Sequence, residues 1–522
     1  MSLERLAGIL LHPTSLPSRS GIGDLGPEAY KFVDFLSEAK LGLWQILPLS
    51  PPGLGNSPYS AISAFAGNPL LVSLDRLADR GWISRDKIKP SAASFREKRI
   101  DFEQVKATKL PLLEEAAQSF LERSFLQSNN RDRQRFEAFK HENDWWLEDF
   151  VLFSVMRSVH RGASWSTWPR ELARREPEAL RKFGLQYQRE LEIERAIQFA
   201  FFEQWRALRR YAAERGIKVV GDVAIFVNYD SADVWRYPDL FYLDHDLQAT
   251  IVAGVPPDAF SATGQRWGNP LYRWDVLKAR GYDWWVQRMS WAVGVCDIVR
   301  LDHFRGFESY WAIPAAELTA VNGSWVPGPK DDLFEELRRQ LGDLPFIAED
   351  LGMITPAVHE LRERLEIPGM KVLQFAFGDP GAHIYLPHNF EPNCVVYTGT
   401  HDNDSTLGWW NSGASAEEKR AALAYIGDAA DGIHWAFIRA AFTSVAKMAI
   451  VPLQDIFGLD SESRMNIPSL SDGNWGWQFE SGMLAGDVAQ KLASLVTVTD
   501  RAPSLSTAGQ QSDREVREDF AA

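Results

Sequence analysis

Cysteine is nearly absent from this sequence. Only Cys296 and Cys394 occur among 522 residues, far apart and outside any spacing that would let them ligate a metal together. This scarcity excludes the disulfide framework of small secreted domains, and unpaired thiols fit a reducing compartment. We therefore expect a cytoplasmic protein.

Long apolar runs and basic surfaces are missing as well. No apolar stretch approaches the roughly 18 residues that a membrane-spanning helix needs, and Ala7–Leu11 is too short for a signal peptide. The formal net charge is −14, and no face rich in Lys and Arg stands out. Neither a membrane nor a nucleic acid is expected as a partner.

Tryptophan, by contrast, is abundant. The chain has 20 Trp, and its 45% of apolar and 24% of charged residues are ordinary for a globular protein with a sizeable core. Many of these indoles will lie in the core. Open-faced aromatic side chains in a cleft also stack on flat ligands, sugar rings among them.

Eight short runs have the apolar, β-branched composition of strands, and helical patterns separate them. One helix is predicted to begin at Pro27 and end before Gly42, and another runs from Ile193 at 3.6-residue spacing to Gly216. Strand–helix units repeated to eight strands predict an α/β fold, a (β/α)8 TIM barrel in preference to an open sheet. The predicted strands are Gly8–Leu11, Leu43–Leu49, Lys218–Val227, Asp297–Phe304, Phe346–Asp350, Met370–Phe377, Cys394–Asp402 and Met448–Phe457.

Two connections are longer than a crossover needs. Residues 91–215 read as charged, amphipathic helix, for example Glu137–Val159, and predict a mostly helical insertion between the second and third strands. Asn228–Gln265 follows the third strand as a long loop of the kind that serves as a lid or binding edge. We expect residues 1–500 to form one interrupted barrel, and residues 501–522 to be a disordered tail.

The stretch Ile298–Gly306 carries the strongest chemical signal. It begins as an apolar, β-branched run and ends in charge. Strand alternation places Arg300 and Asp302 on one face, where the guanidinium would orient the carboxylate and hold it ionised. Barrel enzymes present nucleophiles at such strand ends. A purely structural ion pair is the alternative interpretation of the same residues.

Four strand ends carry an acid, namely Asp222, Asp302, Glu349 and Asp402. In a closed barrel the carboxyl ends of the strands surround one mouth, so these acids are expected to converge on a single pocket. Converging carboxylates suit glycoside chemistry, in which one attacks the anomeric carbon and another protonates the departing oxygen. A carboxyl crowded by others holds its proton more tightly, as a general acid must near neutral pH.

The motifs around these acids resemble the four signature regions of the α-amylase superfamily, and their details resemble the 4-α-glucanotransferases, or amylomaltases. The resemblance extends from about Gly8 to Phe479. Two departures from most α-amylases are Phe226-Val227-Asn228 in the first signature and the lack of a C-terminal β-domain. The supporting runs are Asn56-Ser57-Pro58-Tyr59-Ser60, Phe65-Ala66-Gly67-Asn68-Pro69, Gly221-Asp222-Val223-Ala224-Ile225-Phe226-Val227 and Gly264-Gln265-Arg266-Trp267-Gly268-Asn269-Pro270-Leu271-Tyr272.

The resemblance implies a role for each matching residue. Asp302 would be the nucleophile, Glu349 the general acid/base, and Asp402 would bind sugar hydroxyls and stabilise the transition state. The other implied residues surround the substrate: Arg300 would keep Asp302 charged, His303 and His401 would hydrogen-bond the sugar at the cleaved bond, Asp222 would shape that subsite, Asp258 and Trp267 would line the donor and acceptor path, and Tyr59 would stack on a sugar.

The implied activity is transfer of α-1,4-glucan segments to glucose or another glucan by a retaining mechanism, without a cofactor. Alternatives are a hydrolase or branching enzyme on the same barrel, and a non-catalytic glycan-binding protein. His401 beside Asp402 could be half of a metal site, but no third ligand stands at a suitable spacing. His303 can act with Asp302 only if the strand ends before it, because alternation would otherwise turn it to the opposite face.

Gly21–Gly26 matches the dinucleotide-binding pattern G-x-G-x-x-G, but it stands apart from the preceding strand. We interpret it as a loop at the barrel mouth. Asp222 could be merely a strand-end hydrogen-bond acceptor, and Tyr59 and Trp267 could be core aromatics.

Overall fold

All eight predicted strands are present in the computed structural model, which describes residues 4–88, 99–126, 131–258, 261–378, 380–427, 429–468, 470 and 472–504. The strands close into a barrel in the order β1-β12-β11-β10-β9-β6-β3-β2, and every neighbouring pair is parallel. The predicted TIM barrel is therefore confirmed. Its strands are β1 (Leu6–Leu10), β2 (Leu43–Gln45), β3 (Lys218–Ala224), β6 (Ile298–Asp302), β9 (Phe346–Ala348), β10 (Gly369–Val372), β11 (Cys394–Tyr397) and β12 (Met448–Pro452).

The barrel strands are short, apolar runs because helices cover their outer faces. Every residue of β1, β11 and β12 is buried, as expected for parallel strands packed on both sides. The covering helices and the short helices at the strand ends are α1 (Pro27–Glu38), α9 (Ala232–Arg236), α10 (Trp274–Ala279), α11 (Asp283–Val295), α12 (Arg305–Glu308), α13 (Asp331–Leu341), α14 (Pro356–Arg364), α15 (Thr406–Gly408), α16 (Ala416–Ile426), α17 (Ile433–Thr443), α18 (Leu453–Ile456) and α19 (Gly486–Val498).

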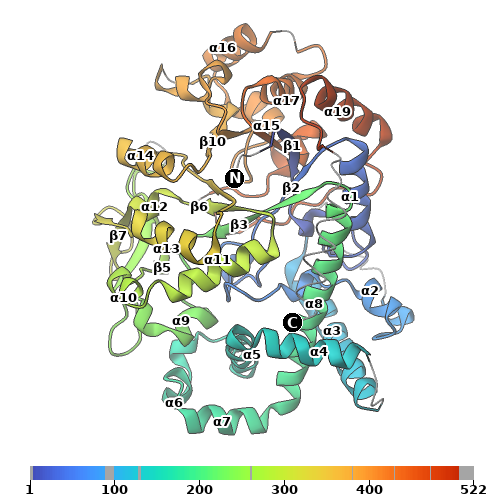
Figure 1. Cartoon of the computed structure of the whole chain (residues 1–522), viewed down its shortest axis with the longest axis vertical. Helices are drawn as coiled ribbons and strands as arrows, with labels where there is room; N and C mark the ends of the chain where they lie inside the picture. Colours follow the sequence, from blue (N-terminus) through green and yellow to red (C-terminus); the bar gives the residue numbers. More distant parts are fainter. Residues whose placement is uncertain are drawn as a thin grey trace.

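The segment between β2 and β3 is helical, and Figure 1 shows most of it as a cyan-to-green group beside the barrel. The helical pattern over Glu137–Val159 is interrupted at Asn143, where one helix ends and the next begins. The Asn143 side chain donates to the carbonyl of Phe139 and accepts from the indole of Trp146, so it competes with helical hydrogen bonding. The helices are α2 (Leu74–Asp79), α3 (Phe102–Leu126), α4 (Arg131–Glu142), α5 (Asp144–Val159), α6 (Arg170–Ala173), α7 (Pro177–Gln186) and α8 (Gln188–Ala213).

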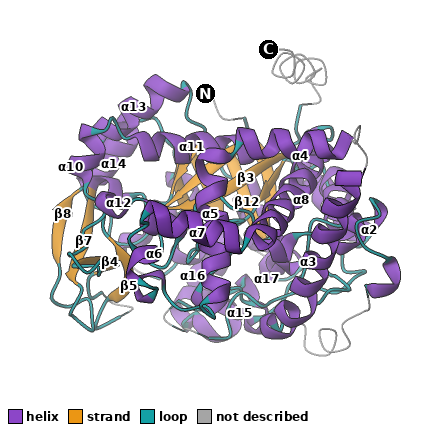
Figure 2. Ribbon diagram, turned by 90° about the horizontal axis from the view of Figure 1, so that it is seen from below, coloured by secondary structure: helices purple, strands orange, loops and turns teal. Residues whose placement is uncertain are grey.

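A second sheet, which the sequence did not predict, stands at one side of the barrel (Figure 2). It is antiparallel, in the order β5-β4-β7-β8. The segment Asn228–Gln265, predicted to be a loop, thus contains some regular secondary structure, namely α9 and strand β4 (Ile251–Val255). The four strands are β4 (Ile251–Val255), β5 (Gln265–Pro270), β7 (Ser309–Pro314) and β8 (Ser324–Pro327).

The glycine-rich segment Gly21–Gly26 is a loop between β1 and α1 that packs against the insertion. The Asp24 carboxylate accepts from Lys109 Nζ of α3 at 3.1 Å and from the backbone N–H of Gly26 at 3.0 Å. Both charged side chains are buried, and Lys109 also donates to the carbonyl of Leu70. This paired charge fastens α3 to the barrel.

Beyond β12, the described residues contain α18 and α19 and no further strand. Arg501 is fully buried and donates to carbonyls that include those of Phe442, Ser444 and Ala446. Most of the predicted disordered tail, residues 505–522, lies outside the described residues. Within the described ranges, no helix is both long and apolar enough to cross a membrane.

Candidate active site

The predicted acids lie at or just beyond the carboxyl ends of four barrel strands. Asp222 lies near the end of β3, and Asp302 is the last residue of β6. Glu349 directly follows β9, and Asp402 lies in the turn beyond β11. Parallel strands in a barrel end at the same rim, so the fold itself gathers these side chains.

Arg300 joins two of the acids. Its Nη1 lies 2.9 Å from Oδ1 and 2.7 Å from Oδ2 of Asp222, and 2.9 Å from Oδ1 of Asp302. The Asp302 contact follows from alternation along β6. The Asp222 contact follows from the parallel register, which places Asp222 directly opposite Arg300.

The Arg300–Asp222 pair is buried, whereas 29% of the Asp302 side chain is exposed. Burial alone would lower the pKa of the Arg300 guanidinium, but the charges of Asp222 and Asp302 outweigh it and hold that pKa well above its usual range. Burial raises the pKa of the Asp222 carboxyl to about 7 against the opposing charge of Arg300. Both Asp222 oxygens accept hydrogen bonds, which favours the ionised form.

Strand β6 ends at Asp302, and His303 adopts a left-handed backbone with φ of 53°. This break in alternation meets the condition under which His303 can share a site with Asp302. The reversed backbone also points the N–H of His303 at Oε2 of Glu349, 2.8 Å away. Burial lowers the pKa of the His303 imidazole to about 4, so the ring is neutral at pH 7.

The Glu349 carboxyl has an environment opposite to that of Asp302. Burial raises its pKa to about 7, the Arg300 charge lowers it, and the Asp302 charge raises it again. Its other oxygen, Oε1, accepts from the backbone N–H of Leu351 at 2.9 Å. Of these two acids, Asp302 is in contact with a cation, and Glu349 has a pKa close to neutral pH, as a general acid requires.

Tyr59, His401 and Asp402 are connected to the cluster through Asp222. The Tyr59 hydroxyl donates to Oδ2 of Asp222 at 2.8 Å, and its ring stacks on His401 with centroids 5.1 Å apart. His401 Nε2 lies 3.4 Å from Oδ2 of Asp402. The Tyr59 ring thus contacts protein side chains in this structure, while its hydroxyl joins the Asp222–Arg300 pair.

The two residues predicted to line the substrate path lie on the small-sheet side. Trp267 in β5 is 39% exposed, and its ring packs edge-on against His303 with centroids 4.8 Å apart. Asp258 is exposed beyond β4, and its carboxylate accepts from the backbone N–H of Ser261. Trp267 is therefore beside the acid cluster, and Asp258 lies between β4 and β5.

Sequence reasoning missed three residues that contact Asp402 or its neighbours Tyr59 and His401. Asn466 donates to Oδ1 of Asp402 at 2.6 Å, and Arg464 donates to the Asp402 backbone carbonyl at 2.8 Å. The Trp475 ring lies 6.0 Å, centroid to centroid, from both Tyr59 and His401. No motif marked these residues, and only the fold brings them to the site. Across the described ranges, no group of three or more His, Cys, Asp or Glu side chains is arranged to hold a metal.

Comparison with known proteins identifies the family of this chain. A family model described as 4-alpha-glucanotransferase matches residues 11–484. The chain belongs to the 4-alpha-glucanotransferase family. A 4-alpha-glucanotransferase from Thermus thermophilus is 45% identical over 96% of this chain and 100% of that protein, and one from a Synechocystis species is 48% identical over 92% and 95%.

A solved structure confirms the fold. An amylomaltase from Streptococcus agalactiae, determined in complex with acarbose, superimposes with a TM-score of 0.91 at 37% identity, over 96% of this chain and 100% of that one. The predicted family and its transferase activity are confirmed at this level.

Replacing Arg300 tests whether the buried cation stabilises the cluster. We expect Arg300→Met to lower the free energy of unfolding by about 3–5 kcal/mol, because Asp222 would remain buried without its cation. Adding Asp222→Asn should restore at least ~1 kcal/mol by removing that stranded charge. Denaturant unfolding at pH 7 measures both.

The matched control is Arg420→Met, which breaks an exposed pair with Glu417 and should change stability by less than about 0.5 kcal/mol. Equal effects of Arg300→Met and the control, or no recovery in the double variant, would contradict this interpretation.

Proposed function

We propose that this chain transfers α-1,4-glucan segments from a donor maltodextrin to the 4-hydroxyl of glucose or another glucan, with retention at the anomeric carbon. The supporting observation is the contrast between two neighbouring acids, Asp302 held by Arg300 and Glu349 with a pKa raised to about 7. They follow the paired residues Leu301 of β6 and Ala348 of β9, so the register of these two strands places the acids side by side at the rim.

In the first step, Asp302 attacks C1 of the donor sugar while Glu349 protonates the departing glycosidic oxygen. The bond from C1 to the leaving glucan breaks, and a covalent bond from C1 to Asp302 forms. Arg300 keeps the Asp302 oxygen in position for this attack. The backbone N–H groups of His303 and Leu351 hold the two Glu349 oxygens, so the acid keeps a fixed direction.

In the second step, Glu349 takes the proton of the acceptor 4-hydroxyl, and that oxygen attacks C1 to displace Asp302. Water must be kept from the same attack for transfer to prevail over hydrolysis. The helical insertion and the small sheet stand beside the mouth and are the elements proposed to shield the intermediate.

The remaining residues are proposed to bind the sugar. Asp402 would bind hydroxyls and stabilise the positively charged transition state, and His303 and His401 would hydrogen-bond the sugar at the cleaved bond. Asp222, through Arg300, would shape that subsite. The residues proposed for the glucan path are Tyr59, Asp258 and Trp267.

Both steps use side-chain acids alone, so the proposal includes no cofactor. The two described cysteines, Cys296 and Cys394, are buried free thiols, which supports a reducing compartment such as the cytoplasm. The proposed partners are α-1,4-glucans and glucose.

Incubation with pure maltotriose is the direct experiment. We expect glucose together with a ladder of longer maltodextrins, because each covalent glucan is passed to another sugar. Chromatography of the products measures this. Rising reducing sugar without a ladder would indicate a hydrolase, new 1,6-linkages a branching enzyme, and unchanged maltotriose a glycan-binding protein.

Neutral variants of the two central acids should be nearly inactive. Asp302→Asn removes the nucleophile and Glu349→Gln removes the proton donor, so each should lower kcat by roughly 10³-fold or more, equivalent to about 4 kcal/mol. Glucan binding, measured by titration calorimetry, should persist. Near-normal turnover of either variant would remove that residue from its role.

The pH dependence reports the protonation of Glu349. The first step needs the protonated carboxyl, so kcat/KM for maltotriose should fall about tenfold per pH unit above a pKa of about 7. A profile that stays level up to pH 9 would contradict the assignment of Glu349 as the acid.

A further inference from the structure

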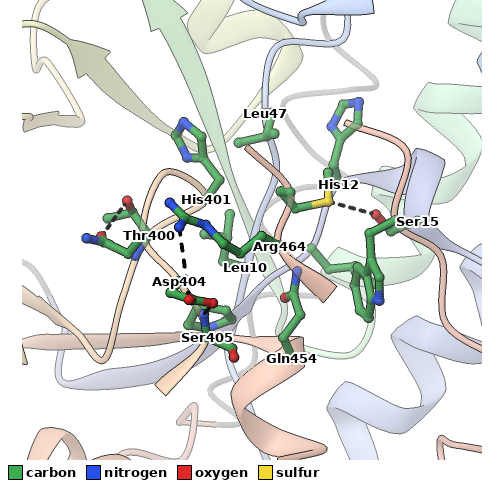
Figure 3. Close-up of a pocket in the computed structure, with 15 residues that line it drawn as sticks. Leu10, His12, Ser15, Leu47, Thr400, His401, Asp404, Ser405, Gln454 and Arg464 are labelled. Carbon is green, nitrogen blue, oxygen red and sulfur yellow. Dashed lines mark hydrogen bonds and ion pairs between the residues drawn. The ribbon is translucent and has the colours of Figure 1, made fainter. Parts of the chain in front are cut away.

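The segment that follows β12 reaches back over the turn that carries Asp402. Arg464 donates to the backbone carbonyl of Asp402 at 2.8 Å and, through Nε, to the carbonyl of Asn466 at 3.3 Å. The Arg464 guanidinium therefore links its own segment to the turn that carries Asp402. Figure 3 shows that Arg464 lies between His401 and Asp404, and all three residues line one small cavity.

Among Asp302, Glu349 and Asp402, the side chain of Asp402 is the most exposed. About 45% of its side chain is exposed, and it lies in a turn rather than on a strand. Asn466 Nδ2 lies 2.6 Å from its Oδ1, whereas the neutral His401 ring lies 3.4 Å from its Oδ2. The shorter contact therefore comes from Asn466.

A second asparagine in the same segment, Asn474, makes different contacts. Asn474 accepts from the N–H of Ile467 at 2.9 Å and donates to the carbonyls of Ile467 and Leu470. These bonds shape the segment, and none of them involves Asp402. The chain thus offers one asparagine that contacts the acid and another that only shapes the loop.

We propose that Asn466 is a positioning residue for the glucan transfer, which orients the Asp402 carboxylate toward the sugar. A partly exposed carboxylate can rotate among several rotamers, and only one presents its oxygens to the substrate. The hydrogen bond from Asn466 selects one rotamer before substrate arrives. The inference rests on the proposed role of Asp402 in binding and stabilising the reacting sugar.

The experiment compares Asn466→Ala and Asn466→Asp with the control Asn474→Ala in maltotriose disproportionation. Both Asn466 variants should lower kcat about ten- to hundred-fold, the usual worth of a hydrogen bond to a charged group, and change KM less than about threefold. Asn466→Asp keeps the shape but replaces the donor with a repelling acceptor, so a space-filling role would tolerate it. Asn474→Ala should stay within about threefold of the parent in kcat.

The proposal is overturned if Asn466→Asp retains the parent kcat, if Asn474→Ala loses as much as Asn466→Ala, or if the loss appears in KM alone. A KM effect would mark Asn466 as a substrate contact instead. In the Asp402→Asn background, Asn466→Ala should cause no further loss, and an additive loss would also overturn it. Failure of the proposed function is distinguishable, because it would appear as a missing product ladder in the parent chain.

Discussion

The candidate site depends on one buried cation shared by two carboxylates. Arg300 projects from the barrel strand β6 and is buried away from water. Its positive charge must therefore be met by protein groups. Asp222 meets it from the neighbouring strand and Asp302 from the same strand. The cation then does two things at once: it holds Asp302 in place, and it opposes the rise in pKa that burial causes at Asp222 and Glu349.

This arrangement explains how one rim can hold acids of different character. Coulombic attraction falls with distance, and Arg300 contacts Asp222 and Asp302 directly, so it holds these two carboxylates most strongly. Glu349 lies on the next strand, is fastened by backbone N–H groups, and also faces the Asp302 charge. The left-handed turn at His303 supplies one of those N–H groups, so the end of β6 contributes to both acids.

Much of this architecture was predictable from local pattern. The eight barrel strands are apolar runs that any parallel sheet requires, and the acids were found because they end those runs. The small sheet was missed because β8 has only four residues and β5 contains Gly268, Asn269 and Pro270, which are typical of turns. The break at Asn143 was missed because its cause is a side-chain hydrogen bond within an otherwise helical pattern.

The contacts within the site were less predictable, because they depend on register. Alternation alone brings Arg300 to Asp302, but only the pairing of β3 with β6 places Asp222 opposite the same guanidinium. The predicted roles of the site residues come from resemblance, and the structure adds the contacts through which such roles would operate. Asn466 stands in a segment without a recognisable motif, and its contact with Asp402 joins residues 64 positions apart.

Asp402 differs from the other acids in what holds it. Asp222 and Asp302 are fixed by a strand-borne arginine, and Glu349 by backbone N–H groups at the barrel rim. Asp402 lies beyond its strand, so the barrel supplies only its approximate place. Its backbone and one carboxylate oxygen are held by the chain that follows β12. Closing the barrel therefore positions three of the acids, and the fourth is completed only when this last segment folds over the mouth.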